Sequence, residues 1–241
     1  MKITLPDNSS RELPEGSSGY DLAKDIGPGL AKSAIAVTIN GVQRDLHDAI
    51  DADASVSIIT IDSDEGVEIM RHTLTAQVLA RAIKNLYPKS KLAIGPTVQD
   101  GFYYDVESDE SISSDDLSKI EEEMKKIIKT KSAITKKLVS KKEALKIFKS
   151  NKEPYKEIII NESDQDDNFQ LYYQDDEEFV DLCRGPHLPN LGFIGSFKLT
   201  KVSGAYWKGD SKNSMLTRIY GTAFSNDKDL QNHLDNIEEA L

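Results

Sequence analysis

The chain has 241 residues, of which 38% are hydrophobic and 29% are charged, and its formal net charge at neutral pH is −11. This balance predicts a soluble globular protein of one large or two ordinary domains and excludes a disordered chain. The sequence contains neither an apolar run as long as a membrane span nor a charged-then-apolar signal segment. Its single cysteine excludes an internal disulfide, so we expect a cytoplasmic protein without membrane contact.

The charges are segregated along the chain. Residues 119–156 include thirteen lysines, whereas residues 162–181 include nine carboxylates and no basic residue. The negative total argues against a simple nucleic-acid binder, because phosphate affinity comes from Lys and Arg. A charge run is usually a solvated face; the alternative here is a basic face that meets a polyanion.

Residues 1–62 are predicted to form a small domain. Residues 1–5 alternate apolar and polar, and a second strand over 9–13 follows a turn. Ser18 is a typical cap for a short helix that ends near Ile26. Further strands are expected over 34–39, 42–46 and 56–61, the first two joined by the hairpin signal Asn40-Gly41. Two strands, one helix and three strands predict a ubiquitin-like β-grasp.

A second domain is expected over residues 63–225. After an acidic linker at 62–66, apolar residues at helical spacing predict a long helix over 67–87, which Pro88 ends. Two further helices are expected, one over 115–131 capped by Ser114, and one that begins at Ser140 with a capping box to Glu143. Short strands are predicted over 92–96, 101–105, 157–160, 171–173, 179–182 and 196–202.

The tail, residues 226–241, is predicted to be a charged linker helix. Because it would stop without a cap, we expect the chain to be a piece of a longer protein. The predicted fold class is therefore α+β, with a β-grasp domain followed by a domain of helices packed on a mixed or antiparallel sheet.

The stretch Asp181-Leu-Cys-Arg-Gly-Pro-His187 is the most informative chemically. It predicts a rigid loop that aims a thiol and an imidazole; the alternative is a buried cysteine packed as a small hydrophobe. Together with His72, Cys183 and His187 could supply three zinc ligands, although C-x3-H is a weak signal without a second close pair. A Cys–His nucleophilic pair is the least favoured reading, because nothing in the sequence indicates a lowered thiol pKa.

The polar residues of the second domain also suit hydrolysis. Such a site needs a base that activates water and donors for the developing oxyanion. Histidine titrates near neutral pH, and a partly buried lysine can be shifted toward it, so His72 or Lys156 could serve, with Asp181 orienting either. The alternatives are a helix-surface histidine, one more solvated lysine, and core packing for the Tyr103-Tyr104 pair.

Four stretches carry a family resemblance: Ala93–Asp105, Asp181–His187, Val202–Asp210 and Arg218–Ala223. They resemble bacterial-type threonyl-tRNA synthetase, and the likeness extends over nearly the whole chain. It implies a TGS domain followed by an editing domain of the kind shared with alanyl-tRNA synthetase, without the catalytic core. It also implies a parent enzyme that is a homodimer and uses ATP, Mg and a zinc in its catalytic core. For this fragment we expect a monomer, and the resemblance implies no definite cofactor for it.

The resemblance further implies a proofreading activity, hydrolysis of serine mischarged onto the 3′ end of tRNA(Thr). Serine lacks only a methyl group of threonine, a difference worth about 1–3 kcal/mol in a binding pocket. In this reading His72 and Lys156 activate water, Asp181 orients Lys156, and Cys183 and His187 shape the serine pocket. The residues expected to bind substrate are Tyr104, Gln77, Gly95 and Arg184.

One departure concerns the family's His-x-x-x-His pair on the long helix. Counted from His72, the second histidine is Ala76; counted back from residues 79–83, the pair falls on Thr73 and Gln77. An extra residue turns a helical side chain by about 100°, so only one register is expected to aim His72 into the pocket. The alternatives are therefore a tRNA acceptor-arm binding module without hydrolysis, which a gain of activity in Gln77→His would reveal, and a freestanding trans-editing protein.

Overall fold

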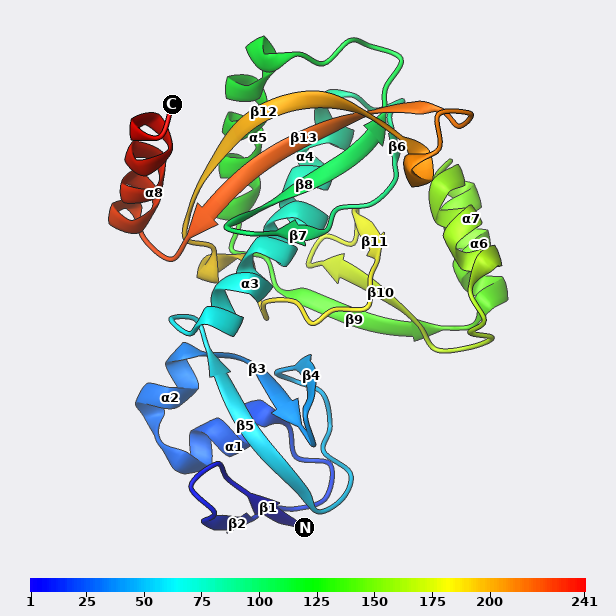
Figure 1. Cartoon of the computed structure of the whole chain (residues 1–241). Helices are drawn as coiled ribbons and strands as arrows, with labels where there is room; N and C mark the ends of the chain where they lie inside the picture. The colour runs from blue at the N-terminus through cyan, green and yellow to red at the C-terminus, as the bar shows by residue number, and fades with distance from the viewer.

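The computed structural model describes all 241 residues, and its first sixty form a sheet that wraps one helix (Figure 1). The sheet order is β2-β1-β5-β3-β4, with β1 and β5 parallel and the other pairs antiparallel. The elements are β1 (Lys2–Thr4), β2 (Ser10–Glu12), α1 (Gly19–Ile26), α2 (Pro28–Ser33), β3 (Ala34–Ile39), β4 (Val42–Asp45) and β5 (Ala54–Thr60). The predicted β-grasp is confirmed; α2, which begins at a proline suited to a first helical turn, is an addition to it.

The long helix that follows is built from three consecutive segments, α3 (Asp64–Thr73), η1 (Leu74–Leu79) and α4 (Ala80–Leu86). The Ser63 hydroxyl caps it by accepting from the Gly66 N–H at 3.0 Å. Residues 64–66 were predicted to be a linker, but they form the first helical turn, because this cap and the acidic residues favour a helix N-terminus.

Two antiparallel sheets complete the larger unit. One has the order β12-β13-β8-β6, with β7 also paired to β8, and the other has the order β11-β10-β9. Their strands are β6 (Lys91–Leu92), β7 (Thr97–Val98), β8 (Gly101–Glu107), β9 (Ile134–Val139), β10 (Phe169–Gln174), β11 (Val180–Leu182), β12 (Ser196–Tyr206) and β13 (Met215–Phe224). The remaining helices are α5 (Leu117–Lys129), α6 (Lys141–Ser150), α7 (Pro154–Glu162) and α8 (Asp227–Glu239).

Several local predictions were wrong. Residues 157–160 belong to helix α7 rather than to a strand, because Pro154 starts a helix and the short apolar run 158–160 fits either structure. The cap before α5 is Ser113, one residue earlier than expected. Strands β9 and β13 were not predicted from the sequence. No helix of the structure combines the length and apolar character needed to cross a membrane.

A single apolar core joins the two units. It contains the buried residues of the long helix, of β8 and of α5, and also Ile35, Ala36 and Ile59 of the β-grasp sheet. A second, smaller core lies between that sheet and α1. Figure 1 shows the long helix leaving the end of β5 and running behind the sheet of β8, β13 and β12. The larger unit is thereby packed directly onto the face of the smaller one.

Gly221 tests how tightly this sheet packs. A Cβ there would lie 2.4 Å from Cζ of the fully buried Phe102 ring. We expect Gly221→Ala to lower the free energy of unfolding by about 1–3 kcal/mol, because the ring has no room to move. Gly204→Ala, whose Cβ would meet only the exposed Met215 side chain, should change it by less than about 0.5 kcal/mol. Urea unfolding followed by circular dichroism measures both, and equal losses would contradict the argument.

Candidate functional site

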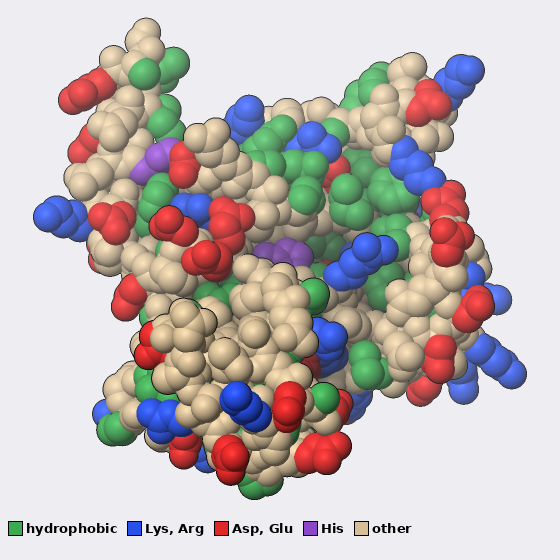
Figure 2. Space-filling view, turned by 60° about the horizontal axis from the view of Figure 1, so that its bottom comes forward, with side chains coloured by type: hydrophobic (Ala, Val, Ile, Leu, Met, Phe, Trp, Pro, Cys, Tyr) green, Lys and Arg blue, Asp and Glu red, His purple; other side chains and the backbone are tan.

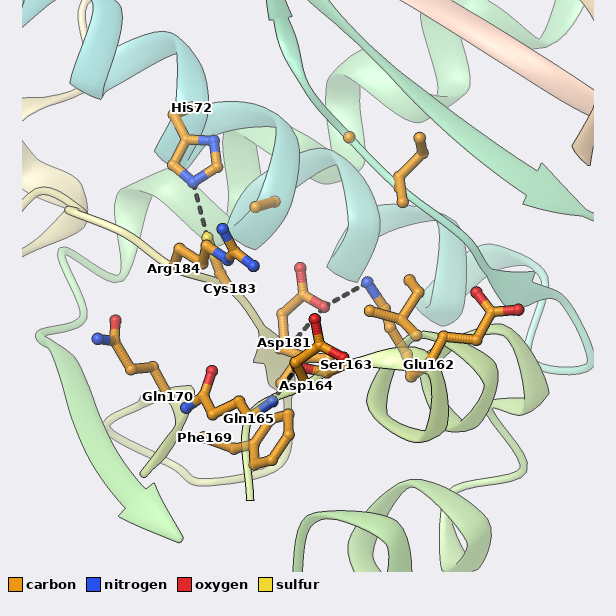
Figure 3. Close-up of a pocket in the computed structure, with 16 residues that line it drawn as sticks. His72, Glu162, Ser163, Asp164, Gln165, Phe169, Gln170, Asp181, Cys183 and Arg184 are labelled. Atoms are coloured by element: carbon orange, nitrogen blue, oxygen red, sulfur yellow. Dashed lines mark hydrogen bonds and ion pairs between the residues drawn. The ribbon is translucent and has the colours of Figure 1, made fainter. Parts of the chain in front are cut away.

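A cavity of about 740 Å³ opens on one face of the larger unit, between the long helix, α7 and β11 (Figure 3). The space-filling view shows a hollow on this face in which histidine, apolar and basic side chains are exposed (Figure 2). The cavity is lined by His72, Ala76, Ile94, Gly95, Lys156, Ile159, Glu162, Ser163, Asp164, Gln165, Phe169, Gln170, Asp181, Leu182, Cys183 and Arg184.

A buried ion pair forms one wall. Lys156 of α7 and Asp181 of β11 are 4% and 2% exposed, and Lys156 Nζ lies 2.8 Å from Asp181 Oδ1. The same ammonium donates to the hydroxyl of Tyr104 at 3.0 Å. Burial acts to lower the pKa of Lys156, but Asp181 and Tyr104 outweigh it and the pKa is raised. Lys156 is therefore an ammonium donor at neutral pH, and the expected shift of its pKa toward neutrality was wrong.

The opposite wall holds a thiol–imidazole pair. His72 Nε2 lies 2.7 Å from Cys183 Sγ, as the dashed line in Figure 3 marks. Burial raises the pKa of the Cys183 thiol to about 12 and lowers the pKa of His72. At neutral pH the thiol is thus the donor and the neutral imidazole the acceptor. The sulfur in turn accepts from the Gly185 N–H at 3.2 Å, which fixes its orientation.

His187 stands behind this pair and does not line the cavity. It is 2% exposed, its ring stacks on that of His72 at 4.6 Å between centroids, and its Nδ1 lies 2.9 Å from Thr73 Oγ1. Burial holds its pKa well below the usual value, so it is neutral. The expected place of His187 in the pocket wall was wrong, because the chain turns at Gly185, with φ +67°, and carries His187 behind the wall.

The donor atoms of His72, Cys183 and His187 lie within 4.8 Å of one another, which makes them a group that could hold a metal ion. The arrangement of the rings does not fit that role. The planes of the two imidazole rings are stacked, with an angle of 5° between them. A metal must lie in the plane of each ring whose nitrogen binds it, and two stacked parallel rings share no such plane. His72 Nε2 and Cys183 Sγ are also too close together, at 2.7 Å. Two ligands of a tetrahedral zinc, with bond lengths near 2.0–2.3 Å, lie about 3.5 Å apart. We therefore derive no chemistry from a metal here.

The four residues expected to bind substrate divide into two groups. Gly95 and Arg184 line the cavity. A Cβ at Gly95 would lie 2.2 Å from Cδ2 of Tyr104, so only glycine allows this close approach. Tyr104 itself is fully buried behind this wall, which corrects its expected place in the pocket. Gln77 is also fully buried, and its backbone carbonyl accepts from Gln174 Nε2 at 3.0 Å, away from the cavity.

Sequence reasoning missed the side of the cavity that follows α7. Residues 162–165, with Phe169 and Gln170, form it, and they lie in the acidic stretch interpreted as a solvated face. Their position in the sequence could have indicated them, because they directly follow the helix that carries Lys156. The run of acidic residues favoured a solvated face instead.

The π-helical segment η1 resolves the two registers of the histidine motif. Its hydrogen bonds close rings that hold one residue more than those of an α-helix, so it absorbs an extra residue without a break. His72 before the segment and residues 79–83 after it can therefore both keep their places in the helix. Ala76 lines the cavity and Gln77 does not, which puts the missing second imidazole at Ala76.

Comparisons with known proteins agree with this architecture. Residues 1–60 match the TGS domain, and residues 170–220 match the threonyl and alanyl tRNA synthetase second additional domain. Over 238 residues the chain is 47% identical to a threonine–tRNA ligase of Prochlorococcus marinus (strain MIT 9211) and 48% identical to one of Hahella chejuensis (strain KCTC 2396).

The two matched domains place the chain in the class of aminoacyl-tRNA synthetase accessory regions. Each alignment covers 99% of this chain and 37% of the relative, so the chain spans somewhat more than a third of the relatives' length. The chain is therefore similar to the region of threonyl-tRNA synthetase that contains the TGS domain and the second additional domain.

Because Cys183 is the only cysteine, its reactivity reports on this site alone. Burial raises the pKa of the Cys183 thiol from its ordinary value of 9.0 to about 12, which lowers the thiolate fraction at pH 8 by roughly 10³. The greater nucleophilicity of a more basic thiolate recovers part of that loss. We expect iodoacetamide to alkylate the native chain at least about 40-fold more slowly than the denatured chain, with a rate that still rises at pH 9. Mass spectrometry measures the rates. A native rate that levels off between about pH 7 and 9 would show a thiolate instead.

Proposed function

We propose that this cavity hydrolyses the ester of serine mischarged onto the 3′ end of tRNA(Thr), the proofreading step of a threonyl-tRNA synthetase. The observation that carries the proposal is the cavity itself, which holds a buried ammonium on one wall and a neutral imidazole on another. These are the two groups that ester hydrolysis needs, a donor for the developing oxyanion and a base for water.

In the proposed reaction the Lys156 ammonium donates to the ester carbonyl and stabilises the oxyanion. The Cys183 thiol turns away from His72 Nε2, and this nitrogen then takes a proton from the attacking water, whose oxygen bonds to the carbonyl carbon. The ester C–O bond then breaks, and the ribose oxygen leaves with the proton from His72. Asp181 keeps Lys156 charged and in place, and Cys183 presents a small neutral wall to the acyl side chain. His187 supports the ring of His72 from behind.

The proposed partner is the acceptor end of tRNA. Arg184 is exposed at the cavity and is suited to a phosphate of the terminal nucleotides. Several lysines of the 119–156 stretch are paired with carboxylates, Lys125, Lys126 and Lys137 among them, which favours a solvated face for that stretch. The positive charge that meets tRNA is therefore proposed to lie at the cavity rather than along the lysine run.

We keep residues 1–62, 63–225 and 226–241 as the proposed TGS domain, editing domain and linker helix. Aminoacylation, with the ATP, Mg and zinc expected for it, is proposed for the whole synthetase rather than for this region. The proposed hydrolysis uses side chains of this chain and water. The monomeric state of this chain and the dimeric state of the parent stay predictions.

Removal of the ammonium is the direct test. We expect Lys156→Ala to lower seryl-tRNA hydrolysis by about 10²–10³-fold, since it removes the oxyanion donor. It also leaves Asp181 buried and unpaired, at a cost of about 3–5 kcal/mol. Lys156→Met combined with Asp181→Asn removes both charges and avoids that cost. Lys228→Ala, on the exposed surface of α8, is the matched control. Undiminished hydrolysis by the folded double variant would defeat the proposal.

A second candidate function is a binding module that docks the acceptor arm without hydrolysis. It is favoured by one observation, that an alanine occupies the cavity position of the family's second histidine. Ala76→His tests it, because this substitution places an imidazole on the wall, whereas Gln77→His puts a bulky polar ring into a packed interior.

If the native chain is an editing enzyme, Ala76→His should change an existing rate by about tenfold or less. If the chain only binds, hydrolysis should arise from a background indistinguishable from the uncatalysed reaction, a gain on the order of 10²-fold for an added acid–base group. Gln77→His should show no gain and a lower melting temperature in either case. Single-turnover hydrolysis of seryl-tRNA and a thermal melt measure these outcomes.

A further inference from the structure

One carboxylate of the β-grasp unit joins three segments of the larger unit. Asp45 ends strand β4, and its Oδ1 accepts from the backbone N–H of His187 at 2.9 Å. Its Oδ2 accepts from the hydroxyl of Tyr172 in β10 at 2.8 Å, and Lys136 Nζ of β9 lies 3.4 Å from the same oxygen. The side chain of Asp45 is only 15% exposed. Hydrogen bonds to a charged acceptor are roughly twice as strong as those between neutral groups, so this contact is well suited to hold a loop in place.

The loop that Asp45 holds is the one that builds the cavity wall. At one end of it Cys183 and Arg184 line the cavity, and at the other end His187 stacks on His72. Between them, the backbone of Gly185 packs against the Tyr172 hydroxyl. A Cβ at Gly185 would lie 2.1 Å from that oxygen and 3.6 Å from Asp45 Oδ1. The loop therefore rests directly on the Asp45–Tyr172 hydrogen bond.

We propose that Asp45 is a positioning residue for the cavity of the neighbouring domain. By anchoring the Tyr172 hydroxyl and the His187 backbone, it fixes the loop that presents Cys183 and Arg184 and keeps His187 against His72. The inference rests on the proposed hydrolytic function and extends it, because the TGS domain then completes the site instead of only flanking it. Displacement of a reacting group by about 1 Å can cost 10²-fold in rate, so a loose loop would be felt in the chemistry.

Asp48 provides a matched control in the same interface. Its carboxylate lies 2.7 Å from Lys136 Nζ, and it makes no hydrogen bond to Tyr172 or to the loop. Both carboxylates are similarly buried, at 15% and 17% exposed. Asp48→Ala therefore removes an interdomain ion pair and leaves the support of the loop intact.

The experiment compares Asp45→Ala, Asp45→Asn and Asp48→Ala in the whole 241-residue chain. We expect Asp45→Ala to lower kcat for seryl-tRNA hydrolysis by about 10- to 100-fold, because the wall is misplaced, and to raise KM by less, because Arg184 lies on the same loop. Asp45→Asn keeps an acceptor for the His187 N–H and should lose less. Asp48→Ala should stay close to the native kcat. Near-ultraviolet circular dichroism confirms folding, and Asp45→Asn carries the test if the alanine variant unfolds.

Alkylation of Cys183 at fixed pH gives a readout that does not depend on the reaction. We expect Asp45→Ala to accelerate it about tenfold or more through local opening of the loop, and Asp48→Ala to leave it unchanged. Native rates of both hydrolysis and alkylation in Asp45→Ala would overturn the positioning role and leave the hydrolytic function intact. Equal losses of hydrolysis in the Asp45 and Asp48 variants would also overturn it, since they would reflect a general separation of the two domains.

The two proposals fail separately. A native chain that does not hydrolyse seryl-tRNA would defeat the proposed function, and alkylation would then decide the role of Asp45 alone. In that case a loop opened only by the Asp45 variants supports the positioning role, and a loop unaffected by them overturns it.

Discussion

The ion pair between Lys156 and Asp181 is the constraint on which the rest of the cavity depends. Moving two charges out of water costs several kcal/mol per ion even in real proteins, and the pair is buried to within a few per cent. Mutual attraction at 2.8 Å offsets that cost together with two further hydrogen bonds, from Lys156 to Tyr104 and from the Leu182 N–H to Asp181. Such a pair stabilises only one arrangement of α7, β11 and β8, and that arrangement is what opens the cavity.

The opposite wall, which holds His72 and Cys183, consists of neutral groups. Burial favours the uncharged forms of His72, His187 and Cys183. The two neutral imidazole rings stack, and the neutral thiol is hydrogen-bonded to His72. A cavity with one fixed cation and one neutral base suits attack of water on an ester, since each group already holds the protonation state that its role requires. The thiol donates to the imidazole of His72, and its raised pKa disfavours a thiolate nucleophile.

The sequence predicted those features that local chemistry specifies. Strand alternation and the Asn40-Gly41 turn were enough for the β-grasp, and the loop around Cys183 was recognised by its composition. Features set by tertiary packing could not be predicted. The apolar run 158–160 suits a strand or a helix equally, and only its packing beside β10 decides. Nothing local distinguishes Cys183, at the cavity, from His187, behind it, because a turn at Gly185 separates them.

The π turn in the long helix has a consequence for how this site can vary. It lets the two halves of the helix differ in register by one residue, since the segment takes up one additional residue while the apolar side chains after Leu79 stay in the core. Loss of a single residue there would return the segment to regular α-helical geometry and would change which side chain faces the cavity. At this place in the helix, the side chain that the cavity wall presents can therefore change through insertion or deletion of one residue as well as through substitution.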